Sequence, residues 1–195
     1  MFMPKTSIAI VIILVAFLSA CGVTQSGGGG GSSGGGGSSG GSTLKYVAVG
    51  YDGQIKTSTD GSTWSDVSVI STGNSLEDVA YGAGTFVAVG KSGRILISTD
   101  NAISWSNETE AGSDLRGVVY DGYQFIAVGN SGRIIRSADG MVWFDETEAG
   151  SSLYDIAYGN DTRVAVGASG RIMRSSNGQT WTDETEAGDF FYDVA

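Results

Sequence analysis

From residue 45 onward, short runs of alternating apolar and polar residues are separated by glycine-containing turns. Val-Ala-Val-Gly, or a close variant, ends at Gly50, Gly90, Gly129 and Gly167, with spacings of 40, 39 and 38 residues. A tryptophan follows each of these glycines before the pattern restarts. Period-two alternation over four to six residues is typical of strands that bury one face. The sequence therefore predicts four copies of one β-unit.

Each full unit contains four runs that fit strands. In the second copy they lie at 76–81, 85–89, 94–97 and from Trp105 onward. Four antiparallel strands in about forty residues match one blade of a β-propeller. We therefore predict an all-β fold, a β-propeller of four four-stranded blades spanning residues 44–195.

The phase of the repeat predicts how such a ring would close. The first unit begins at 45–49, which elsewhere is the second strand, and 190–194 resembles a first strand. We expect this C-terminal strand to pair with the N-terminal blade, closing the ring and hiding two sheet edges. The alternatives are a ring shared with a second copy, which would be a homo-oligomer, and a truncated propeller fragment.

The N-terminus has a different pattern. Lys5 precedes an apolar run over 8–17, which is short for a permanent membrane span and typical of a secretory signal. The following Leu-Ser-Ala-Cys ends at Cys21, the single cysteine, and resembles the lipobox of bacterial lipoproteins. The resemblance implies cleavage before Cys21 and its lipidation. It places the protein in the bacterial cell envelope, outside the cytoplasm, at the outer membrane if the host has two membranes. An uncleaved signal anchor is the alternative.

Residues 22–42 are almost entirely glycine and serine. Such a segment has no apolar pattern from which to build a core, and it behaves as a flexible coil. We therefore divide the chain into a lipoprotein signal peptide (1–20), a lipidated cysteine with a flexible tether (21–43) and the propeller (44–195).

Composition narrows the function. The chain has no histidine, one cysteine, and 21 acidic against 11 basic residues, for a net charge of −10. The usual general base, internal disulfides and cysteine-rich zinc sites are thereby excluded. A strongly acidic surface repels nucleic acid. We expect neither a nucleic-acid partner nor a cofactor.

The turn before each tryptophan carries a second resemblance. Ser-x-Asp-Gly-x-x-Trp and its variants are similar to Asp-box (BNR-type) repeats. The turn residues are Asp60 with Trp64, Asp100 with Trp105, Asp139 with Trp143, and Asn177 with Trp181. We expect the carboxylate or amide to accept hydrogen bonds from turn N–H groups and the tryptophan to pack between blades. The resemblance implies a propeller like those of sialidases or of photosystem II assembly factors.

Two sets of repeated charged residues are candidates for binding. They are Arg94, Arg133 and Arg171 after the Ser-Gly turns, and Asp78, Asp155 and Asp193 on the presumed inner strand. The arginines could bind anionic groups, but cross-strand ion pairs with Asp145 and Asp183 are the plainer interpretation. The aspartates, with Gly117 in the fourth position, could hold a cation or ordered water. Solvation at a channel mouth is their plainer interpretation.

The sialidase resemblance implies non-repeating arginines and a tyrosine nucleophile. Here only Arg116 and Arg163 stand outside the repeated arginine positions. Because copies of one residue cannot fill different catalytic roles, we predict no catalytic residues and no enzymatic activity. We predict a non-enzymatic, membrane-anchored module that binds or scaffolds an unknown protein. The alternatives are a glycan-binding protein, a sialidase-like glycosidase, and a truncated fragment.

Overall fold

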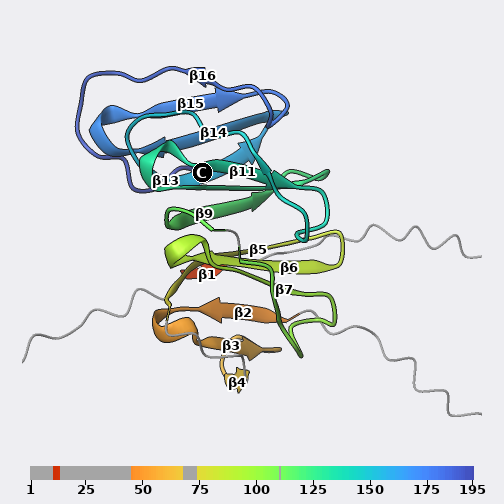
Figure 1. The fold of residues 1–195 in the computed structure, drawn as a ribbon. Helices are drawn as coiled ribbons and strands as arrows, with labels where there is room; N and C mark the ends of the chain where they lie inside the picture. The colour runs from red at the N-terminus through yellow and green to blue at the C-terminus, as the bar shows by residue number, and fades with distance from the viewer. Residues whose placement is uncertain (1–10, 14–44, 68–73, 110) are drawn as a thin grey trace, which may run out of the picture.

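The computed structural model describes residues 11–13, 45–67, 74–109 and 111–195. They form four antiparallel sheets of four strands each, which follow one another from β4 at the bottom of Figure 1 to β16 at the top. The predicted fold is confirmed: the protein is all-β, and its four sheets match the blades of a four-blade β-propeller.

The sheets are β1–β4, β5–β8, β9–β12 and β13–β16. The strands are β1 Val11–Ile13, β2 Tyr46–Val49, β3 Ile55–Ser58, β4 Ser65–Val67, β5 Leu76–Gly82, β6 Thr85–Gly90, β7 Ile95–Ser98, β8 Ser106–Asn107, β9 Leu115–Tyr120, β10 Phe125–Gly129, β11 Ile134–Ser137, β12 Phe144–Asp145, β13 Leu153–Gly159, β14 Thr162–Gly167, β15 Ile172–Ser175 and β16 Thr182–Asp183.

A one-turn 3-10 segment joins the second and third strands of each blade. These turns are η1 Tyr51–Gly53, η2 Lys91–Gly93, η3 Asn130–Gly132 and η4 Ala168–Gly170. Each ends in a glycine with φ near +73°, for example Gly132. A methyl group at Gly132 would also overlap the carbonyl oxygen of Glu148. The repeated Ser-Gly and Asp-Gly pairs of the sequence thus mark positions where only glycine fits without strain.

The hydrophobic core lies between the blades. One cluster joins Val87 and Ile97 of the second blade to Phe125 and Ile135 of the third, and Trp143 packs against it. Equivalent clusters lie between the first and second blades, with Trp105, and between the third and fourth, with Trp181. These three tryptophans therefore contribute to blade-to-blade packing, as the repeat pattern predicted.

The predicted closure by the C-terminal strand is wrong for this structure. The edge of β2 that was expected to receive residues 190–194 pairs instead with β1, from Val11↔Val49 to Ile13↔Val47. Extensive strand contacts join each sheet to the next, and none of comparable extent joins the fourth sheet to the first in the described residues. The reason is competition for one edge, because β1 comes from a Val/Ile run with high strand propensity. The sequence analysis assigned that run to the signal peptide.

The C-terminal segment instead docks beside the fourth blade. The N–H of Phe191 donates to the carbonyl of Gly167 over 3.0 Å, just as the N–H of Leu76 in β5 donates to Gly50 of the first blade over the same distance. Residues 190–195 thus take the position of an inner strand following the fourth blade, although they are not themselves in a strand.

Other N-terminal predictions lie largely outside the described residues. These are the rest of the predicted signal peptide, Cys21 and the tether. Among the residues that are described, no helix has the length and apolarity needed to cross a membrane.

Candidate functional site

A cavity of about 790 Å³, called the central cavity below, lies along the inner strands β5, β9 and β13 and the C-terminal segment. One repeat position contributes to its wall from all four: Glu77, Arg116, Tyr154 and Tyr192. Most other positions of these strands repeat closely, whereas this one carries an acid, a base and two aromatic residues.

The backbone explains why this position faces the cavity. In β5 the pairing with β6 steps from Leu76 directly to Asp78, so Glu77 is an extra residue in a β-bulge. The same irregularity leaves Arg116 unpaired in β9 and Tyr154 unpaired in β13. A bulge re-aims a side chain without disturbing the rest of the sheet. The fold thus gives the second, third and fourth blades one position each at which the side chain can differ.

Three aromatic rings form a patch, of which Tyr154 and Tyr192 line the cavity and Phe190 adjoins them. The ring centroids of Tyr154, Phe190 and Tyr192 are 5.5, 6.1 and 6.4 Å apart, and the ring planes lie within 15° of one another. Because the three distances are similar, the rings form a triangle and not a column. The guanidinium of Arg116 lies over the Tyr154 ring, 5.7 Å from its centroid.

Two of the three predicted aspartates, Asp78 and Asp155, link neighbouring inner segments, whereas Asp193 is exposed in the C-terminal segment. The carboxylate of Asp78 accepts hydrogen bonds from the N–H of Val118, on the next inner strand, and of Val79, both at 2.8 Å. Asp155 accepts the N–H of Val194 at 2.8 Å in the same way. These two aspartates therefore have a structural role that the sequence analysis did not anticipate.

Burial governs their protonation. Burial raises the pKa of Asp78 to about 7, although the two N–H donors act in the opposite direction. It also raises the pKa of Asp155 to about 6, with a contribution from the neighbouring carboxyl of Asp193. Across the described residues, no three acidic or thiol groups are arranged to hold a metal ion. The cation site suggested for these aspartates gains no support from this arrangement.

The repeated arginines are buried between blades. Arg133 donates from Nη1 to the carbonyl of Ser113 at 2.7 Å, and Arg171 donates to Ser151 at 2.6 Å. Arg94 donates to the carbonyl of Asn74 at 2.9 Å. Each arginine thus fastens the segment that leads into an inner strand.

This placement bears out the expected cross-strand attraction only in part: alongside local hydrogen bonds, the charges of Arg133 and Arg171 help to lower the pKa of Asp145 and Asp183. The repeated arginines are not presented as an open ring for anions. Nor do the ion pairs expected with Asp145 and Asp183 occur among those of the described residues.

The turns before the tryptophans have the hydrogen bonds expected from their sequence. Asp60 Oδ1 accepts the N–H groups of Ser62 and Thr63 at 2.8 and 2.7 Å. Asp100, Asp139 and Asn177 accept equivalent bonds in the other blades. These bonds favour the ionised carboxylate and lower the pKa of Asp60. Their effect is local, and these residues contribute to turns and not to the central cavity.

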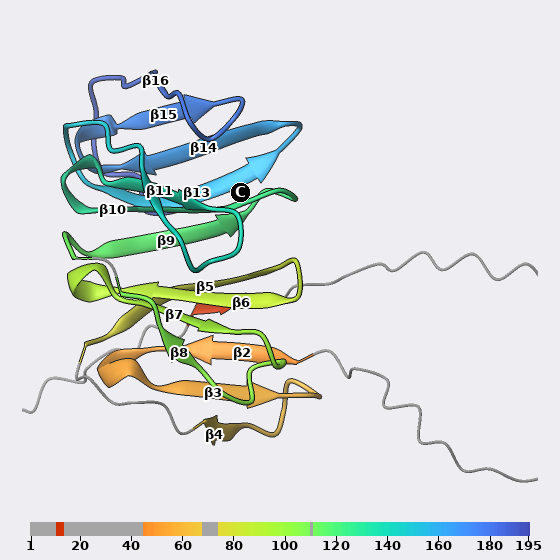
Figure 2. The ribbon, with the colours of Figure 1, turned by 45° about the vertical axis from the view of Figure 1, so that its right-hand side comes forward.

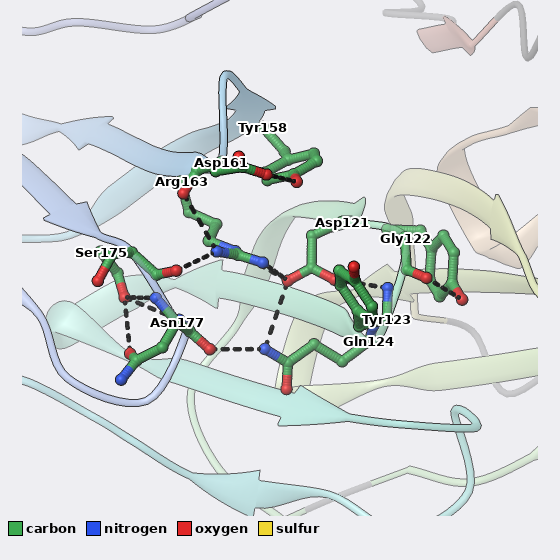
Figure 3. Close-up of polar contacts among 12 residues, drawn as sticks. Asp121, Gly122, Tyr123, Gln124, Tyr158, Asp161, Arg163, Ser175 and Asn177 are labelled. Atoms are coloured by element: carbon green, nitrogen blue, oxygen red, sulfur yellow. Dashed lines mark hydrogen bonds and ion pairs between the residues drawn. The ribbon is translucent and has the colours of Figure 1, made fainter.

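A second polar cluster joins the third and fourth blades (Figure 3). Arg163 donates from Nε and Nη2 to Asp121 Oδ2 at 2.8 and 2.5 Å, and both side chains are almost completely buried. Gln124 connects Asp121 to the carbonyl of Asn177. The sequence indicated Arg163 as non-repeating, but nothing in its pattern predicted Asp121 as the partner.

Arg163 occupies the repeat position of Phe86 and Phe125. Those phenylalanines pack on Tyr81 and Tyr120, with ring centroids 4.4 and 4.8 Å apart. In the fourth blade the Arg163 guanidinium takes the place of the ring, 4.7 Å from the centroid of the equivalent tyrosine, Tyr158. A cation–π pair thus replaces the aromatic pair of the other blades, and Asp121 of the third blade balances the charge of its guanidinium.

Comparison with known structures supports the fold. The chain resembles YCF48 bound to D1 peptide, with a TM-score of 0.60 and 23% identity over 74% of this chain and 52% of that one. It resembles the WD40 β-propeller domain of Doa1, with a TM-score of 0.59 and 15% identity over 75% and 53% of the two chains. For an ancestral GH74 enzyme the TM-score is 0.58, with 16% identity over 71% and 22%.

These likenesses define the class of protein as a β-propeller. The chain spans about half the length of the YCF48 and Doa1 structures. No protein-family model and no curated protein matches the sequence.

Proposed function

We propose that this protein is a lipid-anchored, extracytoplasmic propeller of the Asp-box type whose central cavity binds a segment of a partner protein. One observation carries the proposal. The inner-strand position that varies most among the repeats is a bulge position in β5, β9 and β13, and its four side chains all line the central cavity. Residues that differ between equivalent positions of a repeat are those that can recognise an asymmetric ligand such as a peptide.

The chemistry of the cavity suggests which segment it binds. The triangle of Tyr154, Phe190 and Tyr192 offers aromatic faces, and the carboxyls of Asp155 and Asp193 lie beside it. Aromatic faces bind guanidinium and ammonium groups as well as other rings. A segment that carries basic and aromatic side chains suits this surface, and the net charge of −10 attracts it. The peptide-bound state of YCF48, a structure of the same fold, is consistent with this use.

Selection of random peptides on the full chain tests the binding site. We expect the selected peptides to be rich in arginine, lysine and aromatic residues and to bind more weakly as salt increases. The Tyr192→Ala variant should bind them at least about tenfold more weakly, because an aromatic anchor contributes strongly to a peptide interface. The control is Tyr51→Ala, a similarly exposed tyrosine on the first blade. Equal binding by Tyr192→Ala and wild type would refute the site.

The membrane anchor requires its own test. In a bacterial host fed labelled palmitate, we expect label to enter the wild-type chain and its mass to show cleavage before Cys21. The Cys21→Ser variant should remain unlabelled and unprocessed. Label in Cys21→Ser, or an unprocessed wild type, would contradict a lipoprotein anchor.

The proposal includes no catalysis. The repeated arginines are engaged by backbone carbonyls, and the two inner-strand aspartates Asp78 and Asp155 hold neighbouring strands together. Fluorogenic glycosides should therefore show no turnover. Turnover that disappears in Arg116→Ala would establish the glycosidase alternative.

A further inference from the structure

A second cavity, of about 490 Å³, lies between the third and fourth blades, next to the buried Asp121–Arg163 pair. Its wall comes from the β9–β10 and β13–β14 hairpins and from the turns that follow β11 and β15. Figure 3 shows Tyr158, Asp161 and Arg163 on one side of the cluster and Tyr123 and Gln124 on the other.

This cavity is not a product of the repeat. At the equivalent place between the second and third blades, Gly82 stands for Asp121, Gly84 for Tyr123 and Phe125 for Arg163. An ion pair with a purely structural role would explain why Asp121 and Arg163 depart from the repeat. It does not explain Tyr123, whose side chain is 80% exposed beside the cavity.

The buried charges at the base, Asp121 and Arg163, are engaged by the protein itself. The Arg163 guanidinium donates from Nε and Nη2 to Asp121 and from Nη1 to the carbonyl of Ser176. Asp121 Oδ1 in turn accepts the N–H groups of Tyr123 and Gln124 at 2.9 Å. With all three nitrogens already donating to the protein, this guanidinium has little capacity left to clamp an anionic ligand. The site therefore does not suit an anionic ligand.

The remaining groups suit a ligand that has hydroxyls and one apolar face. Tyr123 offers an open ring, and Gln179 and Asn177 carry amide groups at the rim. Asp161 accepts one hydrogen bond, from the Tyr158 hydroxyl at 3.1 Å, and its carboxylate has further acceptor capacity. Exposed aromatic rings with amide and carboxylate partners provide contacts for both the C–H face and the hydroxyl edge of a sugar.

We propose that this cavity between the third and fourth blades binds a neutral saccharide, stacked on Tyr123 and hydrogen-bonded by Asp161 and Gln179. The site lies apart from the central cavity, and the proposal does not depend on peptide binding there. It gives the propeller a second surface on which it can contact a glycan while the first holds a protein segment.

The test is titration of the full chain with uncharged gluco-, chito-, xylo- and manno-oligosaccharides, followed by calorimetry and ligand-observed NMR. We expect at least one of them to bind with a Kd of about 1 mM or tighter, since such a Kd corresponds to roughly 4 kcal/mol. Tyr123→Ala should weaken that binding about tenfold or more, and Gln179→Ala about threefold. Both residues are exposed, so we expect unchanged unfolding midpoints.

Two controls locate the effect. Tyr51→Ala removes a tyrosine of similar exposure elsewhere and should leave saccharide binding unchanged. Tyr192→Ala, in the central cavity, should also leave it unchanged, which distinguishes this site from the peptide site. Absence of binding by all four saccharide classes would overturn the proposal. So would wild-type affinity in Tyr123→Ala, or binding restricted to acidic sugars.

Discussion

At the scale of single residues, repeated positions and exceptions to the repeat have different roles. Arg94, Arg133 and Arg171 recur because each blade needs the same clamp on the segment that enters it. Arg116 and Arg163 do not recur, and each lies beside one of the two cavities. A residue that breaks a repeat is therefore the better guide to a binding site in this chain.

Asp78 makes stability depend on pH. Its folded pKa of about 7 lies above the reference value of 3.8, because burial disfavours the carboxylate. The folded state therefore binds the proton more tightly than the unfolded state, and stability falls as pH rises from about 4 to 7. We expect urea denaturation to show a loss on the order of a few kcal/mol over this range.

The Asp78→Asn variant cannot ionise, so its loss of stability over the same pH range should be clearly smaller. Asp66→Asn, at an exposed site, controls for removing one negative charge. Parallel pH profiles for wild type and Asp78→Asn would contradict the shifted pKa.

Below about pH 4 the turn aspartates have the opposite effect on stability. The lowered pKa of Asp139 means that stability is lost as pH falls and that carboxylate is protonated.

At the scale of elements, a charge pair joins the third and fourth blades at the repeat position where the third blade carries Phe125 packed on Tyr120. Arg163→Phe restores the repeat residue but leaves the buried Asp121 carboxylate without its cation. We expect a loss of about 3–5 kcal/mol in the free energy of unfolding, the usual cost of breaking a buried pair from one side.

Adding Asp121→Asn to Arg163→Phe removes the stranded charge while keeping an acceptor for the turn N–H groups. The double variant should therefore lose less stability than the sum of the two single variants, as measured in a double-mutant cycle. Simple additivity would mean that the pair does not couple the two blades.

Most strands could be predicted from the sequence because their signals are local. Alternation marks 76–81 and 85–89, and Ser-Gly turns mark the boundaries between strands. The bulge at Glu77 could not be predicted, because it depends on how β5 pairs with β6. Asp121 as the partner of Arg163 was also beyond prediction, since the two lie 42 residues apart and meet through blade packing.

At the scale of the whole molecule, the first and fourth blades lie at opposite ends of the row of sheets in Figure 2. Side chains of the three inter-blade clusters pack each blade against the next. The predicted closure failed because β1 occupies the edge of β2 that residues 190–194 were expected to receive, whereas the predicted blades were confirmed. Removal of a leader before Cys21 would also take away β1, so the proposed processing bears directly on the free edge of β2.

The sequence by itself determined the number of units, the strands within them and the turn residues, because each depends on neighbours a few positions away. Only the tertiary structure decided which edge each segment occupies and which side chains meet across blades. It showed that the varied bulge residues share one cavity and that a buried ion pair adjoins another. Such contacts join residues about forty positions apart, and their geometry depends on packing among all the blades.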